Sequence, residues 1–95
     1  MKANVANLRK ALKASAKAHN VNFEDWSDEG QFGIESEAVP VVADARMIVE
    51  AFYGDPFGLV ETGWGYTTIW AVPDEMMKDV NVELLKMALP YGTRI

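Results

Sequence analysis

The chain contains no cysteine and only one histidine, His19. Without thiols it has no disulfide scaffold, no thiolate nucleophile and no cysteine-ligated zinc or iron–sulfur centre. A lone imidazole, with no second histidine and no serine at nucleophile spacing, does not build a conventional catalytic triad or metal site. We therefore interpret His19 as a capping or packing residue, and we predict no catalytic, cofactor-binding or metal-binding residue.

Long apolar runs and secretion signals are also missing. No segment approaches the roughly 20 apolar residues that a membrane-spanning helix needs, and lysines interrupt the apolar residues of the first twenty, unlike in a signal peptide. We therefore expect a cytoplasmic protein that does not bind membranes. Its 95 residues are enough for one domain, residues 1–95. An aromatic content of 11% indicates that this domain is folded and not disordered.

Cations are scarce outside the N-terminal region. Residues 1–19 carry five Lys or Arg and no carboxylate, whereas residues 20–61 carry ten carboxylates and the single Arg46. The net charge of −5 argues against binding to nucleic-acid phosphates. The N-terminal cations follow one side of a predicted amphipathic helix. They indicate either a solvated face or a surface that docks on the acidic part of a second copy.

In the first part of the chain, the apolar spacing predicts a helix that begins after an Asn4 N-cap and ends near Asn20. Alternating runs over 21–26 and 31–37, joined by a turn that ends at Gly30, predict a β-hairpin.

The second part repeats this order. Residues 41–53 predict a buried helix that Gly54 caps, and residues 57–62 and 66–72 predict a second hairpin. A helical segment follows Pro73, with an interruption near Asn81, and ends at Leu89. The order α-ββ-α-ββ-α predicts an α+β, two-layer fold in which two β-hairpins form a four-stranded antiparallel sheet with helices on one face. The repeated helix–hairpin unit is either an internal duplication or a coincidence.

Gly63-Trp64-Gly65 lacks the surroundings of a phosphate-binding loop. We expect the two glycines to supply positive φ angles at the turn of the second hairpin, which places Trp64 at its tip. An exposed indole there is a candidate anchor for a partner, because tryptophan and tyrosine dominate interface hot spots. The alternative is that Trp64 folds back over the sheet.

The last strand alternates Tyr66, Thr68, Trp70 and Val72 on one face with Thr67, Ile69 and Ala71 on the other, and both faces are apolar toward its end. One face must meet the helices, and we expect the C-terminal segment or another molecule to cover the second.

Trp26 differs in parity from Phe23 and is expected to point away from the core. Asp25, Asp28 and Glu29 lie around the neighbouring turn. The two interpretations are a site for a hard cation such as calcium, for which the twelve-residue calcium-loop spacing is absent, and simple turn formation, which we favour. The predicted partner-binding residues are Trp26, Asp28, Glu29, Glu61, Trp64 and Tyr66.

These features favour a small acidic protein that is not an enzyme and that acts by stoichiometric binding to another protein. Inhibitors of host defence proteins, made by phages and mobile elements, are proteins of this type. The alternative is a homo-oligomer that binds or sequesters a small ligand between subunits, with Tyr66 and Trp70 stacking on it. Self-association, as a homodimer or a higher homo-oligomer, is compatible with both functions.

Overall fold

The computed structural model describes residues 1–55, 58–77 and 79–93. In chain order the elements are α1 (Val5–Ala18), β1 (Phe23–Trp26), the 3₁₀ turn η1 (Ser27–Glu29), β2 (Gln31–Ile34), α2 (Val39–Tyr53), β3 (Val60–Gly63), β4 (Tyr66–Trp70), the 3₁₀ turn η2 (Asp74–Met76) and α3 (Val82–Ala88). The predicted order α-ββ-α-ββ-α is confirmed, as is the interruption at Asn81, which is the N-cap of α3. Phe57, predicted to belong to the second hairpin, lies outside the described residues.

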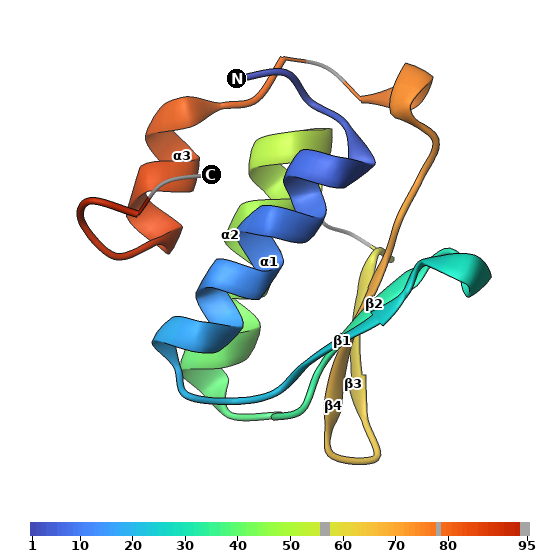
Figure 1. Cartoon of the computed structure of the whole chain (residues 1–95), viewed down its shortest axis with the longest axis vertical. Helices are drawn as coiled ribbons and strands as arrows, with labels where there is room; N and C mark the ends of the chain where they lie inside the picture. Colours follow the sequence, from blue (N-terminus) through green and yellow to red (C-terminus); the bar gives the residue numbers. More distant parts are fainter. Residues whose placement is uncertain (56–57, 78, 94–95) are drawn as a thin grey trace.

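The four strands form one antiparallel sheet in the order β1-β2-β4-β3, so the two hairpins lie side by side. Alternation along the strands sends Phe32, Ile34 and Ile69 to one face, where all three are fully buried. Helices α1 and α2 cover that face, and α3 lies beyond them (Figure 1). Within the described residues, the opposite face of the sheet is covered by no helix.

Helix α1 begins and ends where its sequence predicts. The Asn4 side chain accepts a hydrogen bond from the Asn7 N–H at 2.8 Å, and Asn20 adopts a left-handed φ of 57° just after the helix. Asp74 Oδ1 accepts from the Val5 N–H at 2.8 Å and so places a carboxylate at the positive end of the helix dipole. The buried side chains recur every three or four residues: Leu8, Ala11, Leu12, Ser15 and Ala16.

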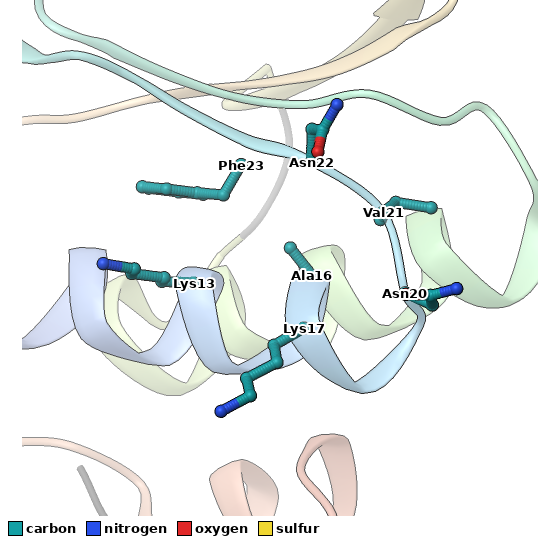
Figure 2. Close-up of a pocket in the computed structure, with 7 residues that line it drawn as sticks. All are labelled: Lys13, Ala16, Lys17, Asn20, Val21, Asn22 and Phe23. Atoms are coloured by element: carbon teal, nitrogen blue, oxygen red, sulfur yellow. The ribbon is translucent and has the colours of Figure 1, made fainter.

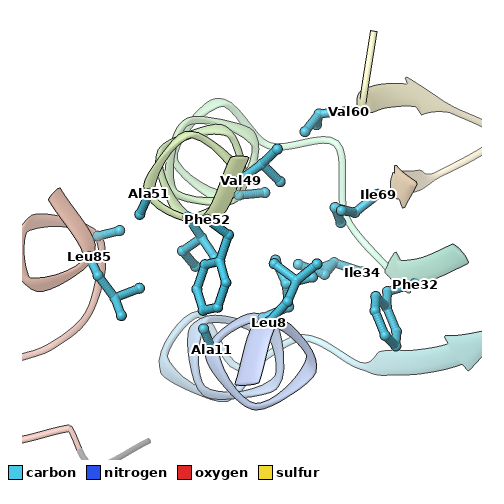
Figure 3. Packing of buried hydrophobic residues seen from close by; sticks show 14 of the residues in the cluster. Leu8, Ala11, Phe32, Ile34, Val49, Ala51, Phe52, Val60, Ile69 and Leu85 are labelled. Atoms are coloured by element: carbon cyan, nitrogen blue, oxygen red, sulfur yellow. The ribbon is translucent and has the colours of Figure 1, made fainter. Parts of the chain in front are cut away.

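Helix α2 lies at the centre of the molecule. Its predicted apolar stripe is buried: Val41, Ala45, Ile48, Val49 and Phe52. Ala51 lies on a different side, next to Leu85 of α3 (Figure 3). The helix begins at Val39, two residues before the predicted start, because the first turn of a helix tolerates Pro40. Gly54 ends it with a left-handed φ of 81°.

The sequence predicted that the five N-terminal cations share one solvated face of the first helix, and this prediction is wrong for two of them. Lys2 precedes α1. Arg9 turns toward the sheet, and its Nε donates to Asp25 Oδ2 at 2.6 Å. Hydrogen bonds from Ser27 and from Arg9 lower the pKa of Asp25 below its usual value. The pair joins α1 to the edge strand β1. The exposed cations of α1 are Lys10, Lys13 and Lys17.

Two polar side chains join the helices to neighbouring segments. His19 is the C-cap of α1, and its Nε2 lies 2.7 Å from Asp44 Oδ2 on α2, in line with the predicted capping role. The Tyr53 hydroxyl, at the end of α2, accepts from the Val72 N–H at 3.1 Å and fixes the segment after β4. Burial raises the pKa of the Tyr53 hydroxyl above its usual value.

Removal of two buried hydroxyl groups should change the free energy of unfolding in opposite directions. In the described structure Ser15 Oγ is buried without a hydrogen-bond partner, whereas Thr67 Oγ1 donates to the Ser36 carbonyl at 2.7 Å. We expect Ser15→Ala to raise the free energy of unfolding by about 1 kcal/mol and the melting temperature by about 4–8 °C. Thr67→Val should lower the free energy by about 1 kcal/mol. Urea unfolding of both variants measures this, and a loss of stability in Ser15→Ala would mean that its hydroxyl is bonded.

Candidate functional site on the uncovered face of the sheet

We call the side of the sheet that points away from α1 and α2 the outer face. The strand register places its side chains in rows. The first row runs from β1 to β4: Trp26, Gln31 and Trp70. The second row crosses all four strands: Glu24, Gly33, Thr68 and Glu61. Tyr66 follows on β4, paired with Gly63 of β3. The outer face therefore combines three aromatic residues with carboxylates on both edge strands.

The aromatic part of the outer face depends on Gly33 in the central strand β2. A Cβ atom at Gly33 would lie 2.5 Å from Cη2 and Cζ3 of Trp26, so the six-membered ring of the indole occupies the space that a side chain would take. The centroids of the Trp26 and Tyr66 rings are 5.3 Å apart, and the rings are tilted by 53°. Trp26 thus reaches from the edge strand across β2 toward β4 and forms a fixed aromatic surface.

The charge on the outer face is negative. Neither hairpin contains a cation, because the sequence has no Lys or Arg in residues 18–45 or 47–77. Desolvation raises the pKa of the Tyr66 hydroxyl, and the negative charges of Glu35 and Glu24 raise it further. Tyr66 is therefore a neutral donor at physiological pH, held in a field that attracts cations.

The β3–β4 turn carries Trp64 at its tip, fully exposed. The expectation that Gly63 and Gly65 supply the positive φ angles is correct only for Gly65. The two central residues of the turn are Trp64, with a φ of 59°, and Gly65, with a φ of 83°, as a type I′ turn requires. The Gly65 N–H donates to Glu37 Oε2 at 2.9 Å, which ties the tip to the segment after β2. The alternative that Trp64 folds back over the sheet is wrong.

The structure brings three of the predicted partner-binding residues together, Trp26, Glu61 and Tyr66, all on the outer face. The turn with Trp64 directly follows the Gly63–Tyr66 pair and so adjoins this face at one end.

Two further predicted residues lie elsewhere. Asp28 and Glu29 belong to η1, beyond the Trp26–Gln31 pair and so at the opposite end of the sheet from Trp64. Both are exposed. Sequence spacing could not show that these residues lie at opposite ends, because that depends on the pairing of β2 with β4, whose partner residues, such as Gln31 and Trp70, are far apart in the chain.

The outer face also contains residues that were not among the predicted site residues, and those that shape its aromatic and acidic character are Glu24, Gly33, Glu35 and Trp70. For Trp70 the sequence did contain a signal, because alternation along β4 places it on the same face as Tyr66. An isolated glycine inside a strand pattern signals a close approach by another group. The neighbours of Glu24 and Glu35 become visible only once the strands are in register.

Hollows elsewhere on the surface differ from the outer face in charge and form. One hollow, of about 360 Å³, lies beside the end of α1. Figure 2 shows the residues that line it, with Phe23 above Lys13. The residues that line it are Lys13, Ala16, Lys17, Asn20, Val21, Asn22 and Phe23. Its lysines and asparagines are exposed, so it offers positive charge without fixed geometry. A hollow of about 520 Å³, largely apolar, lies between α3 and the segment that contains Tyr91.

Across residues 1–55, 58–77 and 79–93, no group of three or more His, Asp or Glu side chains is placed to hold a metal ion. No helix in the same residues is long and apolar enough to cross a membrane. Comparisons with protein-family models, with curated proteins and with solved structures find no match to this chain.

A methyl group at Gly33 should displace the indole of Trp26. We expect Gly33→Ala to lower the free energy of unfolding by about 1 kcal/mol and to weaken the near-ultraviolet circular dichroism of the Trp26–Tyr66 pair. In a Trp26→Ala background the same change should be neutral or stabilising, since glycine weakens a strand. Urea unfolding of the wild type, of the two single variants and of the double variant gives this double-mutant cycle. An equal cost in both backgrounds would show that the indole does not occupy this space.

Proposed function

We propose that this protein is not an enzyme and acts by binding another protein in a defined stoichiometry, through Trp64 and the adjoining outer face. The observation that carries the proposal is the conformation of Trp64. Its side chain is fully exposed, and its backbone has a left-handed φ of 59°.

This position is unfavourable for tryptophan in the isolated chain. A left-handed conformation costs a residue with a Cβ about 1–2 kcal/mol, and asparagine or glycine fits the first central position of a type I′ turn better. Full exposure means that packing does not offset this cost. A bulky residue that lowers stability and presents its ring to solvent is typical of a contact that forms only in a complex.

The charge of the outer face supports a partner with a basic surface. Glu24 and Glu61 lie at the two edges of one row, with no cation on either hairpin. Such complementarity speeds association and selects the partner. A local acidic strip with aromatic residues suits a protein whose basic surface otherwise binds nucleic acid. We therefore propose, as the finer assignment, an inhibitor of the phage or mobile-element type that occupies such a surface on a host defence protein.

The arrangement of the aromatic residues favours a protein over a small ligand. Tyr66 and Trp70 lie on an open sheet face, and Trp70 is 38% exposed. Small-ligand sites are concave and enclose most of the ligand. A small ligand on this face would therefore need a second copy of the chain to enclose it, whereas a protein partner covers an open face directly.

The variant Trp64→Asn tests the proposal, because stability and binding should change in opposite directions. We expect its free energy of unfolding to rise by about 1 kcal/mol, and its affinity for the partner to fall at least about tenfold. Unfolding in urea measures the first. Capture from a host lysate on immobilised protein, followed by native mass spectrometry of the complex, measures the second.

The matched control is Tyr91→Ala, which removes another fully exposed aromatic side chain, from the segment after α3. It should leave capture unchanged. A partner that binds wild type and Trp64→Asn equally would overturn the assignment of Trp64. A partner lost only with Tyr91→Ala would place the binding surface at the segment after α3.

A further inference from the structure

We propose that the outer face binds an arginine side chain of the partner, with the guanidinium plane stacked on the Trp26 indole and hydrogen-bonded to the carboxylates of Glu24 and Glu35. This inference rests on the proposed function, because it names the chemistry that the partner must present. It concerns a part of the surface distinct from the Trp64 turn.

The first support is the fixed position of the indole. Trp26 is seated on Gly33 and lies 5.3 Å, between ring centroids, from Tyr66. It is only partly buried, so the aromatic surface remains open to solvent. The Tyr66 ring limits its movement on the β4 side. Binding of a cation to a ring that is already immobile costs less conformational entropy than binding to a ring that must first be ordered.

The second support is the placement of the carboxylates. Glu24 lies in the same row as Gly33, on which the indole is seated. Glu35 lies two residues after Gly33, and its N–H donates to the Asn22 carbonyl at 2.9 Å, so the pairing of the two strands extends to it. Besides desolvation, the charges of Glu35 and Glu24 also raise the pKa of the Tyr66 hydroxyl. Asn22 Nδ2 donates to Glu35 Oε2 at 3.0 Å, which holds that carboxylate in place. A cation above the Trp26–Tyr66 pair therefore has negative charge beside it.

Arginine fits this combination better than lysine. The guanidinium group is planar, stacks on aromatic faces and donates a fork of hydrogen bonds that matches carboxylates. The lysine ammonium is compact and strongly hydrated, and it gains charge attraction without the stacking contact.

A second copy of this chain is a weaker candidate for the occupant. The exposed cations of α1 are three lysines, Lys10, Lys13 and Lys17. The arginine of that helix, Arg9, already donates to Asp25 at 2.6 Å. Self-docking through α1 would thus bring ammonium groups to the outer face. The preference for arginine over lysine separates the two occupants experimentally.

The test is a titration of the full chain, ¹⁵N-labelled, with blocked hexapeptides of arginine, lysine and citrulline at one ionic strength. We expect hexa-arginine to bind about fivefold tighter than hexa-lysine, which carries the same charge. Hexa-citrulline, which is uncharged, should not bind. The Trp26 indole N–H resonance should shift with arginine and move little with lysine.

Variants assign the effect to the site. Trp26→Leu should reduce the ratio of the affinities for hexa-arginine and hexa-lysine to about one. Glu24→Gln and Glu35→Gln should weaken the binding of both peptides, whereas hexa-arginine should still shift the Trp26 indole N–H resonance. Tyr91→Ala, in the segment after α3, serves as control and should keep the ratio. Equal binding of hexa-arginine and hexa-lysine by the wild type would overturn the proposal, and in that case concentration-dependent mass by light scattering would indicate self-docking through α1.

The two proposals fail separately. If hexa-arginine does not bind but a partner is captured by the wild type and lost with Trp64→Asn, the arginine site is wrong and the protein-binding function stands. If the arginine preference is present but Trp64→Asn captures as much partner as wild type, the site on the outer face stands and the role of Trp64 is wrong.

Discussion

The burial of one face of the sheet is the constraint from which the rest of the structure follows. Phe32, Ile34 and Ile69 point to the same side, and α1 and α2 close over them. The third helix could have covered the other side, but its buried residues, Leu85 and Ala88, pack on α2. Because side chains alternate along a strand, every residue between the core positions is then directed to the outer face. The aromatic and acidic surface is the direct result.

Two local features of that surface are poorly explained by folding alone. Gly33 has no side chain to pack although it lies in a central strand, and the Trp26 indole occupies the space where a side chain would be. Trp64 adopts a left-handed backbone at a hairpin tip, where asparagine would be more stable. Local choices that oppose stability tend to mark functional positions. Both occur at or beside the outer face, and both present aromatic rings, so the binding surface that we propose would account for them.

Much of the fold could be predicted from the sequence, and the site only in part. The order of elements, the Asn4 cap and the buried stripe of α2 follow from local spacing and turn residues, which act over a few positions. The outer face depends on which strands pair and in what register, and this is decided by contacts far apart in the chain. Parity correctly directed Trp26 away from the core, but it did not show which face of the last strand, that of Tyr66 or that of Thr67, meets the helices. It also could not show that Gly33 lies between Trp26 and Tyr66, or that η1 and Trp64 occupy opposite ends of the sheet.

The absence of cysteine from the chain allows the central claim to be tested with single thiols. Thr68 lies in the middle of the outer face, and Ala6 is exposed on α1, in the opposite layer. The most direct measurement is the rate of maleimide labelling of Thr68→Cys and Ala6→Cys, each free and in the stoichiometric complex with the captured partner. Binding through the outer face predicts that both thiols label when free and that only Thr68→Cys is protected in the complex. Protection of Ala6→Cys with continued labelling of Thr68→Cys would contradict it.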